Sequence, residues 1–181
     1  MTLPKFNFGL FLGLTVLLLS PPFSAQVHDE RAIKVAYVFN LTKYVTWPRG
    51  GNQLVVGFVG DGPMGEALQK MLTGRASESR PIRVLLSLED EELEQCDVLY
   101  VAYSSPQKVR ATLERLRGKS VLTVGDTESF PRDGGMIGLV RAGEQVRLQV
   151  NLEVVQGAGL KISSRVLDLA TIVHSNAEAN N

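Results

Sequence analysis

Four short apolar runs, each long enough for one buried strand, are separated along this chain by segments with helical spacing. The runs are residues 53–60 (QLVVGFVG), 82–88 (IRVLLSL), 97–103 (DVLYVAY) and 120–126 (SVLTVGD). The intervening segments are helical in pattern or, in one case, a short acidic turn. Strands that alternate with helices pack as a largely parallel sheet covered by helices. The sequence therefore predicts an α/β domain.

A helix is expected before the first of these strands. Residues 30–47 carry large side chains at three- and four-residue intervals, as in an amphipathic helix, and Pro48 then ends it. The stripe with this spacing consists of Ile33, Tyr37, Asn40, Tyr44 and Trp47, with Val35, Val38 and Val45 alongside it.

The pattern changes after Pro131. Residues 136–151 (MIGLVRAGEQVRLQVN) predict two strands joined as a hairpin, and residues 151–170 predict a final helical element with Asn151 as its cap. We therefore expect a single domain over residues 26–174, with a mostly parallel central sheet, an antiparallel hairpin and a C-terminal helix. The polar residues 175–181 predict a disordered tail.

The N-terminus has the layout of a secretory signal. A lone Lys5 precedes an apolar core of 14 residues (6–19) and a small-residue exit, which predicts a cleaved signal peptide over residues 1–25. A retained membrane anchor is the alternative, but spanning a bilayer takes roughly 20 apolar residues. We expect a periplasmic mature chain that does not insert into the membrane. Its charge is nearly balanced, with 19 basic and 19 acidic residues in the full sequence, so nucleic acid is not an expected partner.

A single cysteine, Cys96, stands at the start of the third predicted strand. It has no intrachain partner, so the fold must be held by its core. Burial as a small apolar side chain is one interpretation. An intermolecular disulfide or a redox role is the other.

Residues 60–65 (GDGPMG) spell G-x-G-x-x-G between a strand and a helix, the spacing that cradles a dinucleotide. That site also needs an acidic residue about 20 positions later, and the nearest, Glu89, comes late. Pro63 offers a simpler account, a tight turn into a helix. The chain also lacks a nucleophile elbow and a zinc-binding histidine pair. We therefore predict no cofactor, no metal and no enzymatic activity.

Successive blocks of the sequence resemble the YfiR-like family of exported bacterial proteins. They are AYVFNLTKYVTWP, VGFVGDGPMG, CDVLYVAYSS, VLTVGD, GGMIGLV and VRLQVNLEVVQGAGLKISSRVLDLA. The resemblance implies a periplasmic repressor that binds the periplasmic sensory region of an inner-membrane diguanylate cyclase, and so controls cyclic-di-GMP and biofilm formation. It also implies a homodimer. Disulfides are implicated in controlling some members, but Cys96 has no second cysteine to pair with in this chain.

Two segments are candidates for the partner or dimer surface. Tyr44, Trp47 and Pro48 place large side chains at the end of the first helix, where aromatic residues are common binding anchors. Core packing of Trp47 is the alternative interpretation.

The second segment lies in the block that resembles the closing motif of the family, and its candidates are Ser163, Ser164 and Arg165. A salt bridge within its own fold is the alternative for Arg165. The alternative function is a periplasmic small-ligand carrier or sensor, with a cleft at the carboxyl ends of the strands near residues 60–65 and 104–105.

Overall fold

The computed structural model describes residues 24–176, with side chains described from Glu30 onward. Nearly all of the predicted signal peptide therefore lies outside the described residues. The elements, in chain order, are α1 (Ser24–Tyr44), β1 (Val45–Thr46), β2 (Leu54–Gly60), α2 (Met64–Leu72), β3 (Ala76–Ser77), β4 (Arg80–Leu86), the 3-10 helix η1 (Asp90–Gln95), β5 (Val98–Ala102), α3 (Pro106–Arg115), β6 (Leu122–Gly125), β7 (Ile137–Ala142), β8 (Gln145–Val150), α4 (Leu152–Gly157), β9 (Lys161–Ile162), α5 (Ser164–Leu167) and β10 (Thr171–Ile172).

The main sheet has the strand order β10-β8-β7-β6-β5-β2-β4-β3. The neighbours from β4 through β2, β5 and β6 to β7 are all parallel. β8 returns antiparallel to β7 as a hairpin. The chain first adds β4 on one side of β2 and then crosses to add β5 on the other, as in doubly wound folds. The predicted α/β class, parallel sheet and hairpin are confirmed.

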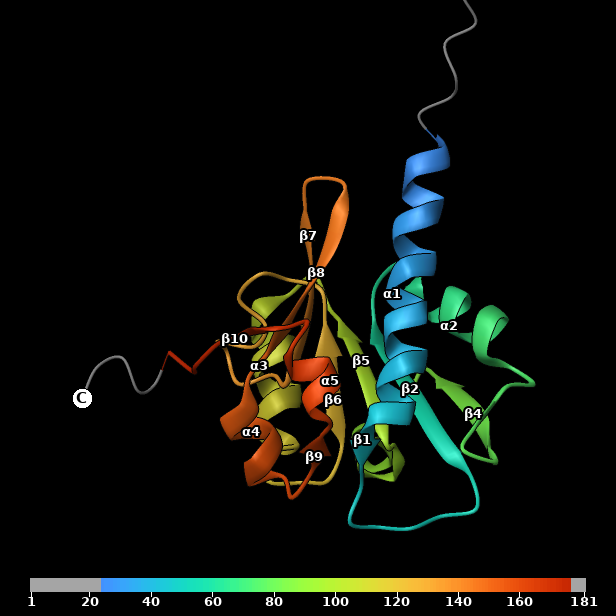
Figure 1. The fold of residues 1–181 in the computed structure, drawn as a ribbon, viewed down its shortest axis with the longest axis vertical. Coiled ribbons are helices and arrows are strands. Elements are labelled where there is room, and N and C mark those ends of the chain that lie inside the picture. Colours follow the sequence, from blue (N-terminus) through green and yellow to red (C-terminus); the bar gives the residue numbers. More distant parts are fainter. Residues whose placement is uncertain (1–23, 177–181) are drawn as a thin grey trace, which may run out of the picture.

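Helices cover both faces of the sheet (Figure 1). Alternate residues of a strand point to opposite faces. In β5, Val98 and Tyr100 pack with the cluster that includes α1 and α2, whereas Leu99 and Val101 pack with the cluster that includes α3 and η1. Strands buried in this way on both faces are apolar at nearly every position, which is why they were recognisable in the sequence.

The first helix differs from its prediction in both its end and its buried face. α1 ends at Tyr44, and the next two residues form β1. The residues that face the core are Val35, Val38 and Leu41, whereas Asn40 is exposed. Val35 and Val38 were expected beside the stripe, so the buried face of α1 is rotated toward them and away from Asn40.

The predicted C-terminal helix is present but divided into α4 and α5, with β9 between them. Gly159 has φ +73, a left-handed conformation that favours glycine and ends helical structure. Asn151 caps α4 as predicted, because its side chain accepts a hydrogen bond from Val154 N at 3.2 Å. Asn151 Nδ2 also donates to Ser175 Oγ at 2.8 Å, and Asn176 N donates to Arg132 O at 3.0 Å. The first two residues of the predicted tail are thus bonded to the domain, and residues 177–181 lie outside the described part.

Candidate functional site

A short strand pair brings the two predicted interaction segments together. β1 pairs antiparallel with β9, with Val45 opposite Ile162 and Thr46 opposite Lys161. The ladder continues through Ser163 N, which donates to Tyr44 O at 2.9 Å. Segments that are far apart in sequence therefore form one continuous surface.

Exposed side chains on this strand pair and its flanks include five that we call the β1–β9 surface, namely Tyr44, Pro48, Lys161, Ser164 and Arg165. Ser163 is half-buried beside them. Tyr44 is 37% exposed, which is unusual for a large aromatic side chain in this structure. The surface thus combines an accessible ring with two cationic side chains.

Arg165 forms no ion pair with any described residue, so the salt bridge that the sequence left open for it is not present in the described chain. The same holds for Lys161. Arginine offers a planar fork of donors that fits a carboxylate, so an unpaired guanidinium is available to a partner.

Trp47 is instead part of the core. Only 7% of it is exposed, and its Nε1 donates to Asp97 O at 2.8 Å. The Asp97 carboxylate accepts in turn from Val55 N at 2.8 Å. The core-packing interpretation of Trp47 is the one that the described chain adopts, and this side chain offers a partner little area.

Cys96 lies between η1 and β5, and its side chain is buried, with 1% exposed. Burial, together with the nearby negative charges of Asp97 and Glu92, raises the pKa of its thiol to about 12. Disulfide exchange proceeds through the thiolate. A redox role or an intermolecular disulfide therefore requires local opening of this region, and it stays a prediction.

The G-x-G-x-x-G stretch is closed against the neighbouring loop. A Cβ at Gly60 would lie 2.3 Å from the carbonyl carbon of Ala102, so glycine is needed for the close approach of β2 and β5. Asp61 N donates to Ala102 O at 2.9 Å, and the Asp61 carboxylate accepts from Ser104 N at 2.9 Å. This hydrogen bond lowers the pKa of Asp61. Asp61 thus ties the glycine turn to the β5–α3 loop, so the turn has a structural role in the described chain.

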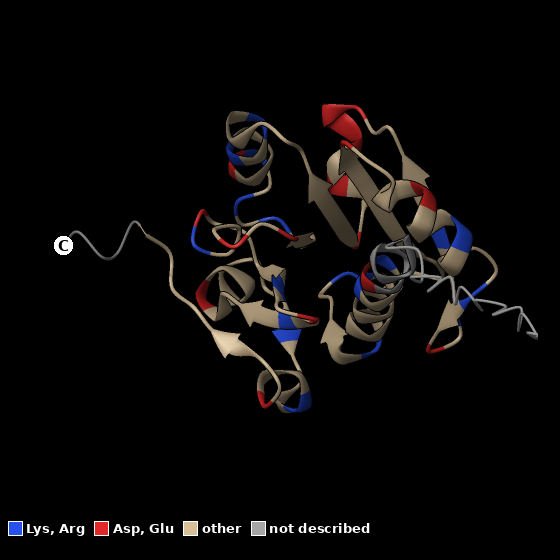
Figure 2. Cartoon of the chain, turned by 90° about the horizontal axis from the view of Figure 1, so that it is seen from above, with Lys and Arg blue, Asp and Glu red and all other residues tan. Residues whose placement is uncertain are grey.

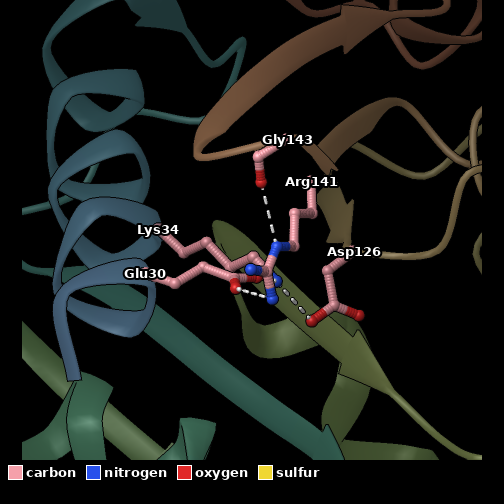
Figure 3. Close-up of polar contacts among 5 residues, drawn as sticks. All are labelled: Glu30, Lys34, Asp126, Arg141 and Gly143. Atoms are coloured by element: carbon pink, nitrogen blue, oxygen red, sulfur yellow. Dashed lines mark hydrogen bonds and ion pairs between the residues drawn. The ribbon is translucent and has the colours of Figure 1, made fainter. Parts of the chain in front are cut away.

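One ionic cluster was not identified from the sequence (Figure 3). Lys34 is 7% exposed, and its Nζ lies 2.9 Å from Glu30 Oε1 and 3.1 Å from Asp126 Oδ2. Arg141 Nη1 lies 3.5 Å from Glu30 Oε2, and Arg141 Nε donates to Gly143 O at 3.1 Å. Two carboxylates thus compensate a buried ammonium group, whose burial would otherwise be costly.

The cluster ties α1 to the end of β6 and to the β7–β8 hairpin, which runs beside the helix in Figure 1. Tyr100 lies fully buried close by, and burial followed by the Asp126 charge raises the pKa of its hydroxyl. The sequence signals were Glu30 and Lys34 one helical turn apart and Asp126 directly after a buried strand. We interpret the cluster as a clamp on the position of α1.

A groove of about 470 Å³ lies between the C-terminal parts of α3 and α4. Its lining includes the exposed Arg110, Arg132 and Asn176 and the buried Met136. This position is not the carboxyl edge at residues 60–65, where the sequence led us to expect a cleft.

A comparison with protein-family models decides the relationship that the sequence blocks indicated. The model described as YfiR/HmsC-like matches residues 31–171 of the 181-residue chain. The chain belongs to the YfiR/HmsC-like family. This family is regulatory and non-catalytic, and membership implies a periplasmic regulator of diguanylate cyclase signalling. Among residues 24–176, no helix is long and apolar enough to cross a membrane.

Proposed function

We propose that this protein binds the periplasmic sensory region of an inner-membrane diguanylate cyclase and holds the enzyme in its inactive conformation. Repression would lower cyclic-di-GMP and restrain biofilm formation. The observation that carries the proposal is the β1–β9 surface, where Arg165 is exposed without an ion-pair partner among the described residues and the exposed Tyr44 is bonded through its backbone to Ser163.

Repression of this kind is a shift of population. A protein that binds the inactive cyclase about a hundredfold more tightly than the active form contributes about 2.7 kcal/mol of bias. An evenly balanced equilibrium would then become about 99% inactive at saturation. A surface with a few specific charged contacts is sufficient for a difference of this size, since hydrogen bonds to charged groups contribute about 1.5–3 kcal/mol each.

The test is capture of the purified periplasmic segment of the cyclase by the immobilised protein. Arg165→Glu should weaken capture about tenfold or more, because it replaces attraction with repulsion at an exposed position. Arg110→Glu is the matched control, since Arg110 is exposed on α3, on the opposite face of the sheet. Both variants should keep the wild-type melting temperature. Equal capture by the two variants would remove Arg165 from the interface, and no capture by the wild type would refute the cyclase as partner.

We also propose that the protein is a homodimer. Leu169 and Ile172 are 80% and 41% exposed, and they lie in or next to the edge strand β10. Apolar side chains at a sheet edge are suited to pairing with a second copy. Light scattering measures the oligomeric state. We expect a dimer for the wild type and a monomer for Leu169→Glu. A monomeric wild type would contradict the proposal.

The groove between α3 and α4 favours a second candidate, a carrier or sensor of small molecules. Its volume is in the range of small-ligand sites. A thermal-shift screen of periplasmic metabolites should raise the melting temperature of the wild type if this function holds, and should have less effect on Arg132→Ala. No shift with any compound would leave the regulatory function as the better supported one.

A further inference from the structure

Three cationic side chains lie against two aromatic rings on the side of α1 that packs with α2 and β3. Lys43 Nζ is 4.2 Å from the centroid of the Phe39 ring, and Arg75 Cζ is 5.2 Å from the same centroid. Arg80 Cζ is 5.6 Å from the centroid of the Trp47 ring. We call these five residues the cation–aromatic row. Its members come from α1, the segment after it, the α2–β3 loop and β4.

The row lacks compensating charge. None of its cations forms an ion pair with a described carboxylate. Glu78, at the tip of the β3–β4 turn, is a nearby carboxylate in the sequence, but it forms no ion pair with any of them. Elsewhere in the described chain, cations such as Arg115 and Lys119 do pair with carboxylates, those of the acidic η1 turn, which is red in Figure 2. Lys43 and Arg75 share one ring and repel each other. An added anion would relieve that repulsion.

The aromatic rings also reduce the free-energy cost that the cations pay when they bind an anion. A cation held over an aromatic face has lost part of its water and part of its conformational freedom before a partner arrives. Arg80 is half-buried, whereas Lys43 and Arg75 are exposed and accessible. The adjacent β3 is the terminal strand of the main sheet, so one side of its backbone has no strand partner among the described residues. Extended peptides bind to such edges by adding a strand.

We propose that the cation–aromatic row and the β3 edge form a docking surface for an extended acidic protein segment. Carboxylates along the segment pair with Lys43, Arg75 and Arg80, while its backbone lies along β3. Cations from separate elements match carboxylates spaced along a peptide better than one compact phosphate. The inference stands on these charges and rings, and it does not require the partner to be a diguanylate cyclase.

The test uses the full mature chain and a fluorescein-labelled octaglutamate peptide in an anisotropy titration. The control is Arg147→Glu, since Arg147 is exposed on β8, near the opposite end of the sheet from β3. The wild type and Arg147→Glu should bind the peptide equally, whereas Arg75→Glu/Arg80→Glu should bind about tenfold or more weakly. Raising the salt concentration from about 50 to about 500 mM should weaken wild-type binding, because the contacts are exposed. An octaglutamine peptide is the control for charge and should not bind.

A second variant protects the test against loss of folding. Lys43→Gln/Arg75→Gln changes only exposed side chains, so its melting temperature should match the wild type and its peptide affinity should still fall. Equal affinity in all variants, or an equal loss in Arg147→Glu, would overturn the proposal. Row-dependent binding to phosphatidylglycerol vesicles without binding to the peptide would also overturn it, because the surface would then recognise lipid. None of these outcomes depends on whether the cyclase is captured.

Discussion

Replacing Trp47 with phenylalanine separates a core role from a partner-binding role for the only tryptophan in the chain. The indole Nε1 donates to Asp97 O at 2.8 Å, and the side chain is 7% exposed. Losing this hydrogen bond costs about 1 kcal/mol. The smaller ring leaves a void that costs about 1–2 kcal/mol more. We therefore expect the free energy of unfolding to fall by about 2–3 kcal/mol, which lowers the melting temperature by about 5–10 °C.

The assay is urea unfolding followed by far-ultraviolet circular dichroism, because Trp47→Phe removes the fluorescent reporter. The dependence of unfolding free energy on urea should be unchanged, so that the midpoint alone moves. Tyr44→Phe is the control. Tyr44 is 37% exposed and its hydroxyl has no hydrogen-bond partner among the described residues, so stability should change by less than about 0.5 kcal/mol.

Capture of the cyclase segment is measured on the same two variants. If Trp47→Phe keeps wild-type stability and loses capture, Trp47 is a surface anchor and the reasoning from its burial is refuted. In the wild type, emission from Trp47 should resist quenching by acrylamide, since a buried ring is shielded from the quencher.

Three further predictions concern groups that only the fold makes unusual. Folding raises the pKa of Cys96 from 9.0 to about 12, so the folded chain holds a proton that the unfolded chain releases above pH 9. The free energy of unfolding therefore falls as the pH rises above 9, and at pH 10 it is about 1.4 kcal/mol lower than at pH 7. Urea titrations of Cys96→Ala should lack this component, and a difference from wild type that is constant between pH 7 and 10 would contradict it. Lys34→Met leaves Asp126 without its ion-pair partner and Glu30 with Arg141 alone, and it should cost about 2 kcal/mol in urea unfolding. The cost is less than for a fully buried pair because Asp126 is part-exposed. Lys34→Met/Asp126→Leu should recover part of that loss, and an unchanged single variant would refute the clamp. Gly60→Ala places a methyl group against Ala102 and forces φ +131 on alanine, so it should cost about 3 kcal/mol or more and give little soluble protein, whereas Gly62→Ala meets no neighbouring atom and should cost less.

The strands could be predicted because their signal is local. A strand buried on both faces, such as the one holding Val98 and Tyr100, must be apolar at nearly every position, and this reads directly from the sequence. The cap at Asn151 was predictable for the same reason, since its partner Val154 lies three residues away. The end of α1 was not predictable, because the residues after Tyr44 leave the helix to pair with β9, whose sequence is remote.

The candidate site was predictable only in part. The β1–β9 surface contains Tyr44 and Pro48 from the end of the first helix, and Ser164 and Arg165 from the block that resembles the closing motif of the family. Their adjacency depends on the β1–β9 pairing. The sequence left Trp47 open between this surface and the core, because a helix end gives no indication of which side of a large ring is covered, and the ring lies in the core. The proposal that this surface binds a partner stays a prediction.

The sequence by itself determined that this chain forms an α/β domain with a parallel sheet and a closing hairpin, and that it belongs with the YfiR/HmsC-like proteins. These properties follow from periodicity and short blocks, which are encoded within a few residues. Tertiary structure alone decided that Lys34 would be buried between Glu30 and Asp126, and that Arg75 would share a ring with Lys43. Burial and pairing of charges are properties of space, because the energy of a charge depends on distance and on surrounding water, neither of which a linear pattern specifies.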